Sequence, residues 1–154
     1  MHIKFNEEHI QAISNHAEKT YPEECCGLLL GTIEGEAKTV IEVWPTANMW
    51  DKENPQNISD KNILTKRQRY VLDPQMMLKA QREGRDRGLN IIGFYHSHPD
   101  HPAVPSECDR EYAWPEYSYI IIAVKTGKTT DILSWNLNEN YQFQPEQILN
   151  TPPH

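Results

Sequence analysis

The sequence is short of basic residues. Fifteen lysines and arginines stand against 22 aspartates and glutamates, so the formal net charge is −7 at pH 7. The one basic cluster, "KRQR", spans Lys66–Arg69. A protein that binds nucleic acid needs a basic surface to contact the phosphates, so this composition disfavours a nucleic-acid partner.

Long apolar runs are also absent. The first ten residues, "MHIKFNEEHI", lack the apolar stretch of a signal peptide, and the longest apolar run, Ile120–Val124, is a strand's length and not a membrane span. The three cysteines, Cys25, Cys26 and Cys108, form neither a disulfide framework nor a CxxC site. We therefore expect a cytoplasmic protein with reduced thiols and no membrane contact.

No internal repeat, low-complexity tract or domain linker divides the 154 residues, which predicts a single domain over 1–154. Helix signals recur twice: Asn6 can cap a helix over Asn6–Thr20, and Asp73 with Gly88 can bound a helix over Pro74–Arg87. The alternation of helices with strands predicts an α/β or α+β domain.

Strands are expected in the apolar segments between these helices and after them. Their expected positions are Cys26–Thr32, Ala37–Trp44, "NIIGFYHSH" from Asn90, "YSYIIIAV" from Tyr117, "TDILSWNL" from Thr130, and a short last strand near "YQFQ". Residues 46–69 are polar and lack apolar periodicity, which is typical of a long loop or insertion. Residues 150–154 are expected to form a frayed tail.

The segment "FYHSHPDHPAVPSECDREYAW" holds the residues best suited to chemistry. Side chains two apart in a strand point to the same face, so His96 and His98 project together while Ser97 points away. Pro99 lacks a backbone donor and should end the strand's pairing. Asp109, ten residues further on in a short helix, can add a carboxylate. A catalytic zinc site typically has three protein ligands, such as two histidines and one carboxylate, and a fourth position that is open to water or substrate.

Each of these residues also has a simpler explanation. Two exposed histidines on an edge strand occur by chance, and Ser106 with Asp109 resembles a helix-capping box. The capping role and the metal role are compatible. His101 is expected to be solvated or to contact a metal ligand without binding the metal itself, whereas four other histidines are expected to be surface residues. These are His2, His9, His16 and His154.

A hydrolytic zinc site also needs a base that takes a proton from water and passes it to the leaving nitrogen. Glu23 and Glu24 lie just before the strand "CCGLLLG". Local spacing does not choose between them, and exposed acids near the end of a helix are the simpler interpretation of both.

Two segments resemble the JAMM/MPN+ metalloprotease family. "HSHPDHPAVPSECD" matches its His-x-His-Pro and Ser-x-x-Asp motif, and "PEECCGLLLG" matches the upstream Pro-x-Glu-x-Cys-Gly pattern, which selects Glu24. The resemblance implies an MPN domain, with a curved mixed β-sheet flanked by helices and similar to cytidine deaminases.

By this resemblance, His96, His98 and Asp109 hold one catalytic zinc ion, with water as the fourth ligand. Glu24 activates that water and protonates the leaving amine, and Ser106 stabilises the oxyanion. The resemblance also implies the substrate: a peptide or isopeptide bond after the C-terminal Gly-Gly of a ubiquitin-like protein, in bacterial forms a sulfur carrier. Residues 46–69 can form a flap over that partner or a plain insertion.

Two other functions are also compatible with the sequence. Cys108 with a nearby histidine could form a cysteine hydrolase, which a thiol reagent would inhibit and a zinc chelator would not. Alternatively, the domain could be a non-catalytic MPN scaffold that binds zinc or a ubiquitin-like tail without turnover.

Overall fold

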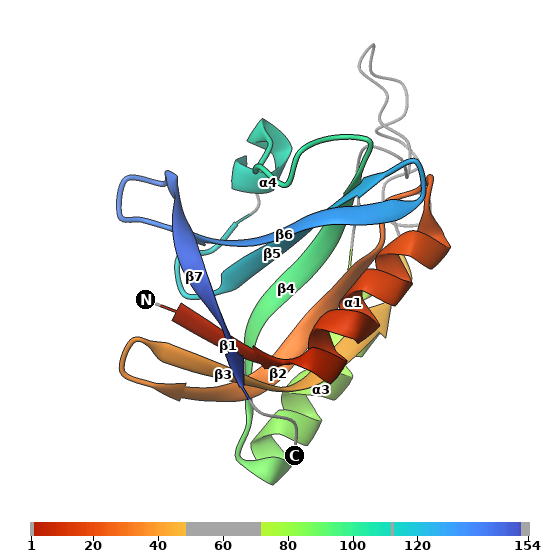
Figure 1. Cartoon of the computed structure of the whole chain (residues 1–154). Helices are drawn as coiled ribbons and strands as arrows, with labels where there is room; N and C mark the ends of the chain where they lie inside the picture. The colour runs from red at the N-terminus through yellow and green to blue at the C-terminus, as the bar shows by residue number, and fades with distance from the viewer. Residues whose placement is uncertain (1, 49–71, 112, 152–154) are drawn as a thin grey trace.

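Seven strands in the described part of the chain form one mixed sheet, and three helices pack beside it (Figure 1). The computed structural model describes residues 2–48, 72–111 and 113–151. The strands are β1 (His2–Asn6), β2 (Cys26–Glu34), β3 (Ala37–Thr46), β4 (Asn90–Pro99), β5 (Ser118–Lys125), β6 (Lys128–Leu137) and β7 (Phe143–Thr151). The helices are α1 (Glu7–Thr20), α3 (Pro74–Arg87) and α4 (Glu107–Glu111).

The sheet closes on itself in the order β1, β3, β2, β4, β5, β6, β7. The closing strand is β1, which pairs in parallel with both β3 and β7. The pair β4 and β5 is also parallel, whereas the remaining neighbours are antiparallel. The predicted curved, mixed sheet flanked by helices is therefore confirmed, and its curvature is strong enough to join the two edge strands.

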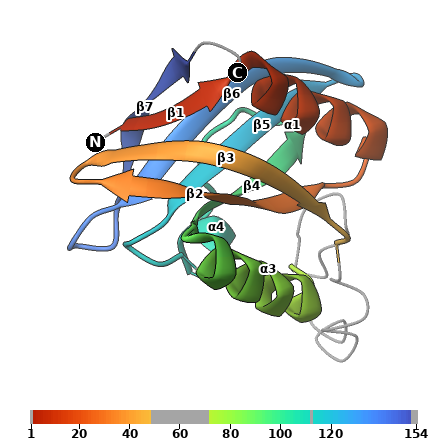
Figure 2. The same ribbon diagram turned by 90° about the horizontal axis from the view of Figure 1, so that it is seen from below.

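The two long helices cover opposite faces of this sheet, as Figure 2 shows for α1 and α3. Side chains alternate along each strand, so Leu29 of β2 packs with α1 whereas Leu28 and Leu30 pack with α3. The same alternation divides β5, where Ile120 faces the core under α1 and Tyr119 the core under α3. Burying each such side chain stabilises the fold by about 1.5–3 kcal/mol.

The helix predictions are confirmed closely. Asn6 caps α1, since its side chain accepts a hydrogen bond from the backbone N–H of His9 at 2.9 Å. Asp73 caps α3 in the same way through Gln75 at 2.9 Å, and Gly88 ends the helix with φ of 70°. None of the three helices in the described ranges is long and apolar enough to cross a membrane.

Two strand predictions fell short at the ends of the chain. The strand β1 was not expected, although Ile3 and Phe5 alternate with polar residues and are fully buried. The strand β7 runs from Phe143 to Thr151, so residues 150 and 151 belong to the sheet and not to a frayed tail. Residues 152–154 of that tail, and residues 49–69 of the expected polar loop, lie outside the described residues.

A buried charge network lies where β3, β5, β6 and β7 approach one another. Lys38 is 4% exposed, and its ammonium donates hydrogen bonds to the Ser118 hydroxyl at 2.8 Å and to the Glu116 carbonyl at 3.3 Å. Glu146 is 5% exposed and accepts a hydrogen bond from the Ser134 hydroxyl at 2.7 Å. Burial lowers the pKa of Lys38, and the charge of Glu146 opposes that shift.

Replacing Lys38 by methionine is expected to lower the free energy of unfolding by about 3 kcal/mol, because it leaves the Glu146 carboxylate buried without a compensating cation. Urea unfolding of the two proteins measures the difference. Adding Glu146→Gln to the variant should recover much of the loss. A loss below about 1 kcal/mol in the single variant would show that Glu146 does not depend on Lys38.

Candidate metal centre

His96 and His98 lie at the end of β4, on the face of the sheet that also carries α3 and α4. They pair with Ile121 and Ala123 of β5, whose side chains pack on the same face. Both imidazoles are buried, and their Nε2 atoms are 3.2 Å apart. Ser97 points to the opposite face, as the alternation predicted, and β4 ends at Pro99.

The short helix α4 brings Asp109 to these two histidines. Its start is a reciprocal cap: the Ser106 hydroxyl accepts a hydrogen bond from the backbone N–H of Asp109 at 3.1 Å, and the backbone N–H of Ser106 donates to the Asp109 carboxylate at 2.8 Å. The carboxylate oxygens lie 3.1 Å from His96 Nε2 and 3.2 Å from His98 Nε2. The Asp109 side chain therefore caps the start of α4 and contacts both histidines.

The spacing of these three groups fits a tetrahedral metal ion. Ligand atoms about 2.0–2.1 Å from zinc lie about 3.3 Å from one another at a tetrahedral centre. His96 Nε2 is 3.1 Å from one Asp109 oxygen, His98 Nε2 is 3.2 Å from the other, and the two nitrogens are 3.2 Å apart. Imidazole nitrogen and carboxylate oxygen are also donor atoms that zinc prefers. The three side chains therefore offer suitable donor atoms close enough together for one metal ion.

The electrostatics of the cluster favour the protonation states that a metal ligand needs. Burial lowers the pKa of His96, which keeps that imidazole neutral, and the charge of Asp109 only partly opposes the shift. Burial would raise the pKa of Asp109, but the contacts of its carboxylate with His96 and His98 and the hydrogen bond from the Ser106 N–H hold that pKa well below its usual range. Asp109 is therefore ionised.

Glu24 reaches the same cluster from the segment before β2. Its carboxylate and one ring nitrogen of each histidine all lie within 4.8 Å of one another. Glu24 is 4% exposed, whereas Glu23 is exposed to solvent. The structure thus brings Glu24, and not its neighbour, to the histidines, which local spacing did not decide.

Two hydrogen bonds between Cys25 and Ser97, called the Cys25–Ser97 clamp below, hold the segment of Glu24 beside β4. The backbone N–H of Cys25 donates to the Ser97 hydroxyl at 2.8 Å, and the Ser97 N–H donates to the Cys25 carbonyl at 3.1 Å. The residue after Glu24 is therefore bonded to the residue between the two histidines. In addition, the Asn48 side chain donates to the Glu24 carbonyl at 3.2 Å.

A second link joins the same two segments through Asp100, which follows β4. The Asp100 carboxylate accepts hydrogen bonds from the Tyr21 hydroxyl at 2.7 Å and from the Thr126 N–H at 2.9 Å. The backbone of Asp100 has φ of 57°, a left-handed conformation that aspartate tolerates better than most residues. Sequence reasoning missed Ser97 and Asp100, since nothing local indicates that they face the segment of Glu24.

Within the described residues, the metal-ligating cluster contains no histidine besides His96 and His98. His101 is exposed, and His9 belongs to the cap of α1. His16 is half-buried and not a plain surface residue, because its Nδ1 lies 2.7 Å from the hydroxyl of the fully buried Tyr95. His154 lies outside the described residues.

The thiols of Cys25 and Cys26 are free and buried. Burial raises the pKa of Cys25 to about 12 and that of Cys26 to about 11, so neither is a thiolate at neutral pH. The side chain of Cys108 is outside the described part of the structure, and the cysteine-hydrolase hypothesis stays untested.

The contact of His16 with Tyr95 predicts a pH dependence of stability. Burial lowers the pKa of His16 below its ordinary value. The unfolded chain therefore binds a proton near pH 6.5 that the folded chain does not, so the free energy of unfolding is expected to fall as pH drops below about 6.5. In His16→Gln, urea unfolding at pH 7, 6 and 5 should show a smaller fall. Equal slopes in both proteins would contradict the assignment.

The sheet, the cluster and its two strand links define the class to which this protein belongs. The family described as prokaryotic homologs of the JAB domain matches residues 6–138, and the chain belongs to that family. The resemblance seen in the two sequence motifs is thereby confirmed.

Particular relatives are similar over parts of the chain. The desampylase of Haloferax volcanii is 36% identical over 101 residues, which are 65% of this chain and 62% of the relative, so the match spans less than two thirds of that protein. The CysO-cysteine peptidase of Mycobacterium tuberculosis is 24% identical over 129 residues, 83% of this chain and 77% of the relative. Among solved structures, a protein of Desulfitobacterium hafniense has a TM-score of 0.78 at 27% identity, covering 98% of this chain and 94% of its own.

Proposed function

We propose that this protein is a zinc-dependent metallopeptidase or isopeptidase that hydrolyses the bond after the C-terminal Gly-Gly of a ubiquitin-like or sulfur-carrier protein. The observation that carries the proposal is the buried convergence of two imidazoles, one ionised carboxylate and Glu24. Relatives named desampylase and CysO-cysteine peptidase support a peptidase activity on small protein conjugates.

In this proposal His96, His98 and Asp109 hold one zinc ion. Zinc bound there would polarise the scissile carbonyl and lower the pKa of a water molecule to about 7. Two imidazoles and one carboxylate leave a fourth position open, which distinguishes a catalytic site from a closed structural one.

Glu24 takes the proton of the attacking water and passes it to the leaving nitrogen. Its side chain is buried and near both histidines but is held by a different segment, which suits a base beside the ligands. Ser106 stabilises the oxyanion. Its oxygen already accepts a hydrogen bond from the Asp109 N–H, so its own hydroxyl hydrogen remains free to be donated to the developing negative charge.

The depth of the site is compatible with the proposed Gly-Gly substrate. Glycine has no side chain, so a Gly-Gly tail can approach a base and ligands that are almost fully buried. Such a tail would lie extended along a strand edge and bond through its main chain. The proposed flap of residues 46–69 falls largely outside the described residues.

A direct test uses the zinc-loaded protein and sulfur-carrier proteins extended by a short peptide beyond Gly-Gly. Mass spectrometry should detect the carrier ending at Gly-Gly together with the released peptide, and a chelator should stop the reaction. Fusions in which Gly-Gly is replaced by Val-Val serve as the matched control and should remain intact. Binding of the carrier tail without any cleavage would instead support the non-catalytic scaffold.

A further inference from the structure

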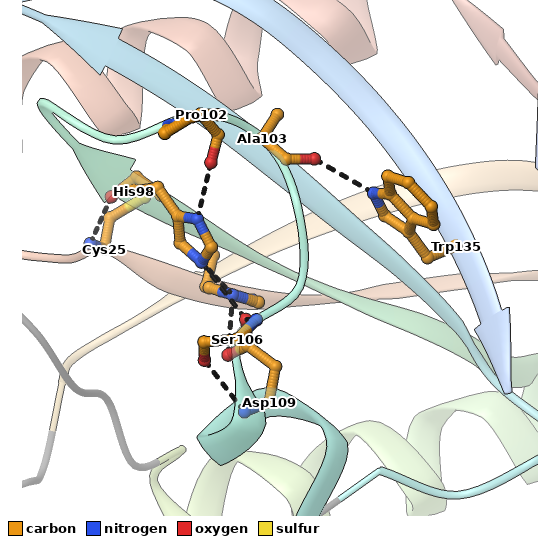
Figure 3. Close-up of polar contacts among 9 residues, drawn as sticks. Cys25, His98, Pro102, Ala103, Ser106, Asp109 and Trp135 are labelled. Carbon is orange, nitrogen blue, oxygen red and sulfur yellow. Dashed lines mark hydrogen bonds and ion pairs between the residues drawn. The ribbon is translucent and has the colours of Figure 1, made fainter. Parts of the chain in front are cut away.

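In the connection between His98 and Ser106, two consecutive backbone carbonyl groups contact side chains on opposite sides (Figure 3). The Pro102 carbonyl lies 2.8 Å from His98 Nδ1, and the next carbonyl, that of Ala103, accepts a hydrogen bond from the indole N–H of Trp135 at 3.0 Å. Trp135 belongs to β6 and is separated from His98 by 37 positions in the sequence. The two carbonyl groups that these side chains contact nevertheless belong to adjacent residues.

We propose that Trp135 is a positioning residue for the metal centre. By anchoring the Ala103 carbonyl it fixes the Pro102 carbonyl, which in turn orients the imidazole of His98 through its Nδ1 atom. The inference rests on the proposed function for its consequence in catalysis, but its structural content concerns the protein without metal.

The contact at Nδ1 follows from the chemistry of the acceptor. A carbonyl oxygen can only accept a hydrogen bond, so His98 Nδ1 must carry a hydrogen at this contact. The other ring nitrogen, Nε2, faces His96 and Asp109 and is the atom that the ring presents to a metal ion. A histidine that coordinates zinc through one nitrogen usually donates its other N–H to such an acceptor, which fixes the ring and strengthens the ligand.

The backbone of Trp135 is held by strand pairing, whereas the segment around Ala103 is not. Trp135 lies within β6 and pairs with Tyr119 of β5 and Pro145 of β7, so strands on both sides fix its backbone. Its ring packs with Ala103, which is 2% exposed, and with the buried Ile121 of β5. The segment around Ala103, in contrast, has no regular secondary structure.

The same anchor affects the other half of the centre. Ser106 follows Ala103 by three residues and opens the helix that carries Asp109. A displacement of the Ala103 peptide would therefore move His98's acceptor and the start of α4 together. The indole N–H thus links β6 to both sides of the ligand set.

Two variants of Trp135 separate hydrogen bonding from packing. Trp135→Phe keeps an aromatic ring but has no N–H donor, whereas Trp135→Gln keeps an N–H at a similar distance from the backbone but has no ring. Trp44→Phe is the matched control, because Trp44 on β3 also uses its indole N–H, to the Glu42 carboxylate at 3.1 Å, but packs in the core under α3. Thermal unfolding of all three shows whether each is folded.

Two measurements decide the inference. The first is the zinc dissociation constant, obtained by competition with a chelating dye; Trp135→Phe should raise it about tenfold, Trp135→Gln less, and Trp44→Phe less than twofold. The second is the presence of a hydrogen on His98 Nδ1 in the metal-free protein, read from the nitrogen chemical shifts of its ring. Wild type should carry this hydrogen, and Trp135→Phe should carry it in a smaller fraction of molecules.

Unchanged zinc affinity and an unchanged fraction of His98 Nδ1–H in Trp135→Phe would overturn the inference while leaving the proposed function intact. If wild type binds no zinc, the proposed function fails, and the comparison of the Nδ1–H fractions still decides the inference. If the Trp135 variants do not fold, two measurements on the wild-type protein decide the inference: the exchange rate of the Trp135 indole N–H and the presence of a hydrogen on His98 Nδ1. A protected indole N–H of Trp135 with the hydrogen of His98 on Nδ1 supports the proposal, and an N–H that exchanges as fast as that of the exposed Trp114 overturns it.

Discussion

Glu24→Gln is expected to remove nearly all cleavage of a Gly-Gly fusion and to leave zinc bound. Glutamine has almost the same shape as glutamate, so the buried side chain and the Cys25–Ser97 clamp beside it should stay in place. It cannot take a proton from water at neutral pH, however, and general bases contribute about 10²–10⁴-fold to a rate. A fall in kcat of that size is expected, measured by the rate of product release at saturating substrate.

Zinc analysis of the same sample separates a lost base from a lost metal. The neighbouring Glu23→Gln is the matched control, since Glu23 is exposed and should be replaceable without effect on kcat. Full activity of Glu24→Gln with one zinc per chain would rule out the role proposed for Glu24. Equal losses in both variants would indicate that the segment, and not one carboxylate, is required.

Asp109→Asn is expected to weaken zinc binding by at least about a hundredfold. Groups that only contact metal ligands typically contribute 10–100-fold to metal affinity, and a direct ligand should contribute more. Asparagine can keep the acceptor for the Ser106 N–H, so the start of α4 should survive. It loses the negative charge and presents an NH₂ group in place of one of the oxygens that now face His96 and His98.

The matched control for this prediction is Glu107→Gln, which removes an acid from the same turn of the same helix. Glu107 is exposed and pairs with Arg110, away from the histidines. Competition with a chelating dye should give Glu107→Gln the affinity of wild type. An equal loss in the two variants would mean that helix charge, and not coordination by Asp109, sets the affinity.

Local signals in the sequence were sufficient for most of the fold. Capping residues and a terminal glycine fixed both long helices to within a residue, because these residues act on the backbone beside them. The ends of the sheet were not predictable in this way. β7 contains Pro145 and Glu146 and takes its partners from β6 and then β1, so its pattern reflects distant neighbours more than local alternation.

The two histidines proposed as ligands were predictable for the same local reason, whereas the residues that support them were not. The His-x-His spacing in a strand brings two rings together whatever lies around them. Glu24 required the resemblance to a family, since its proximity to the histidines depends on the pairing of β2 with β4. Trp135 gave no signal at all, because its contact with Ala103 arises only when β6 packs beside the connection after β4.

The position of β1 has a consequence for synthesis. β1 emerges from the ribosome before the other six described strands, but one of its two partners, β7, emerges after all of them. Until residues 143–151 are made, β1 has an unpaired edge, and no other described strand can take the place of β7 without breaking the pairing order. Closure of the sheet is therefore expected only after β7 has been made, and a nascent chain stalled before β7 would offer an open strand edge to aggregation partners and chaperones.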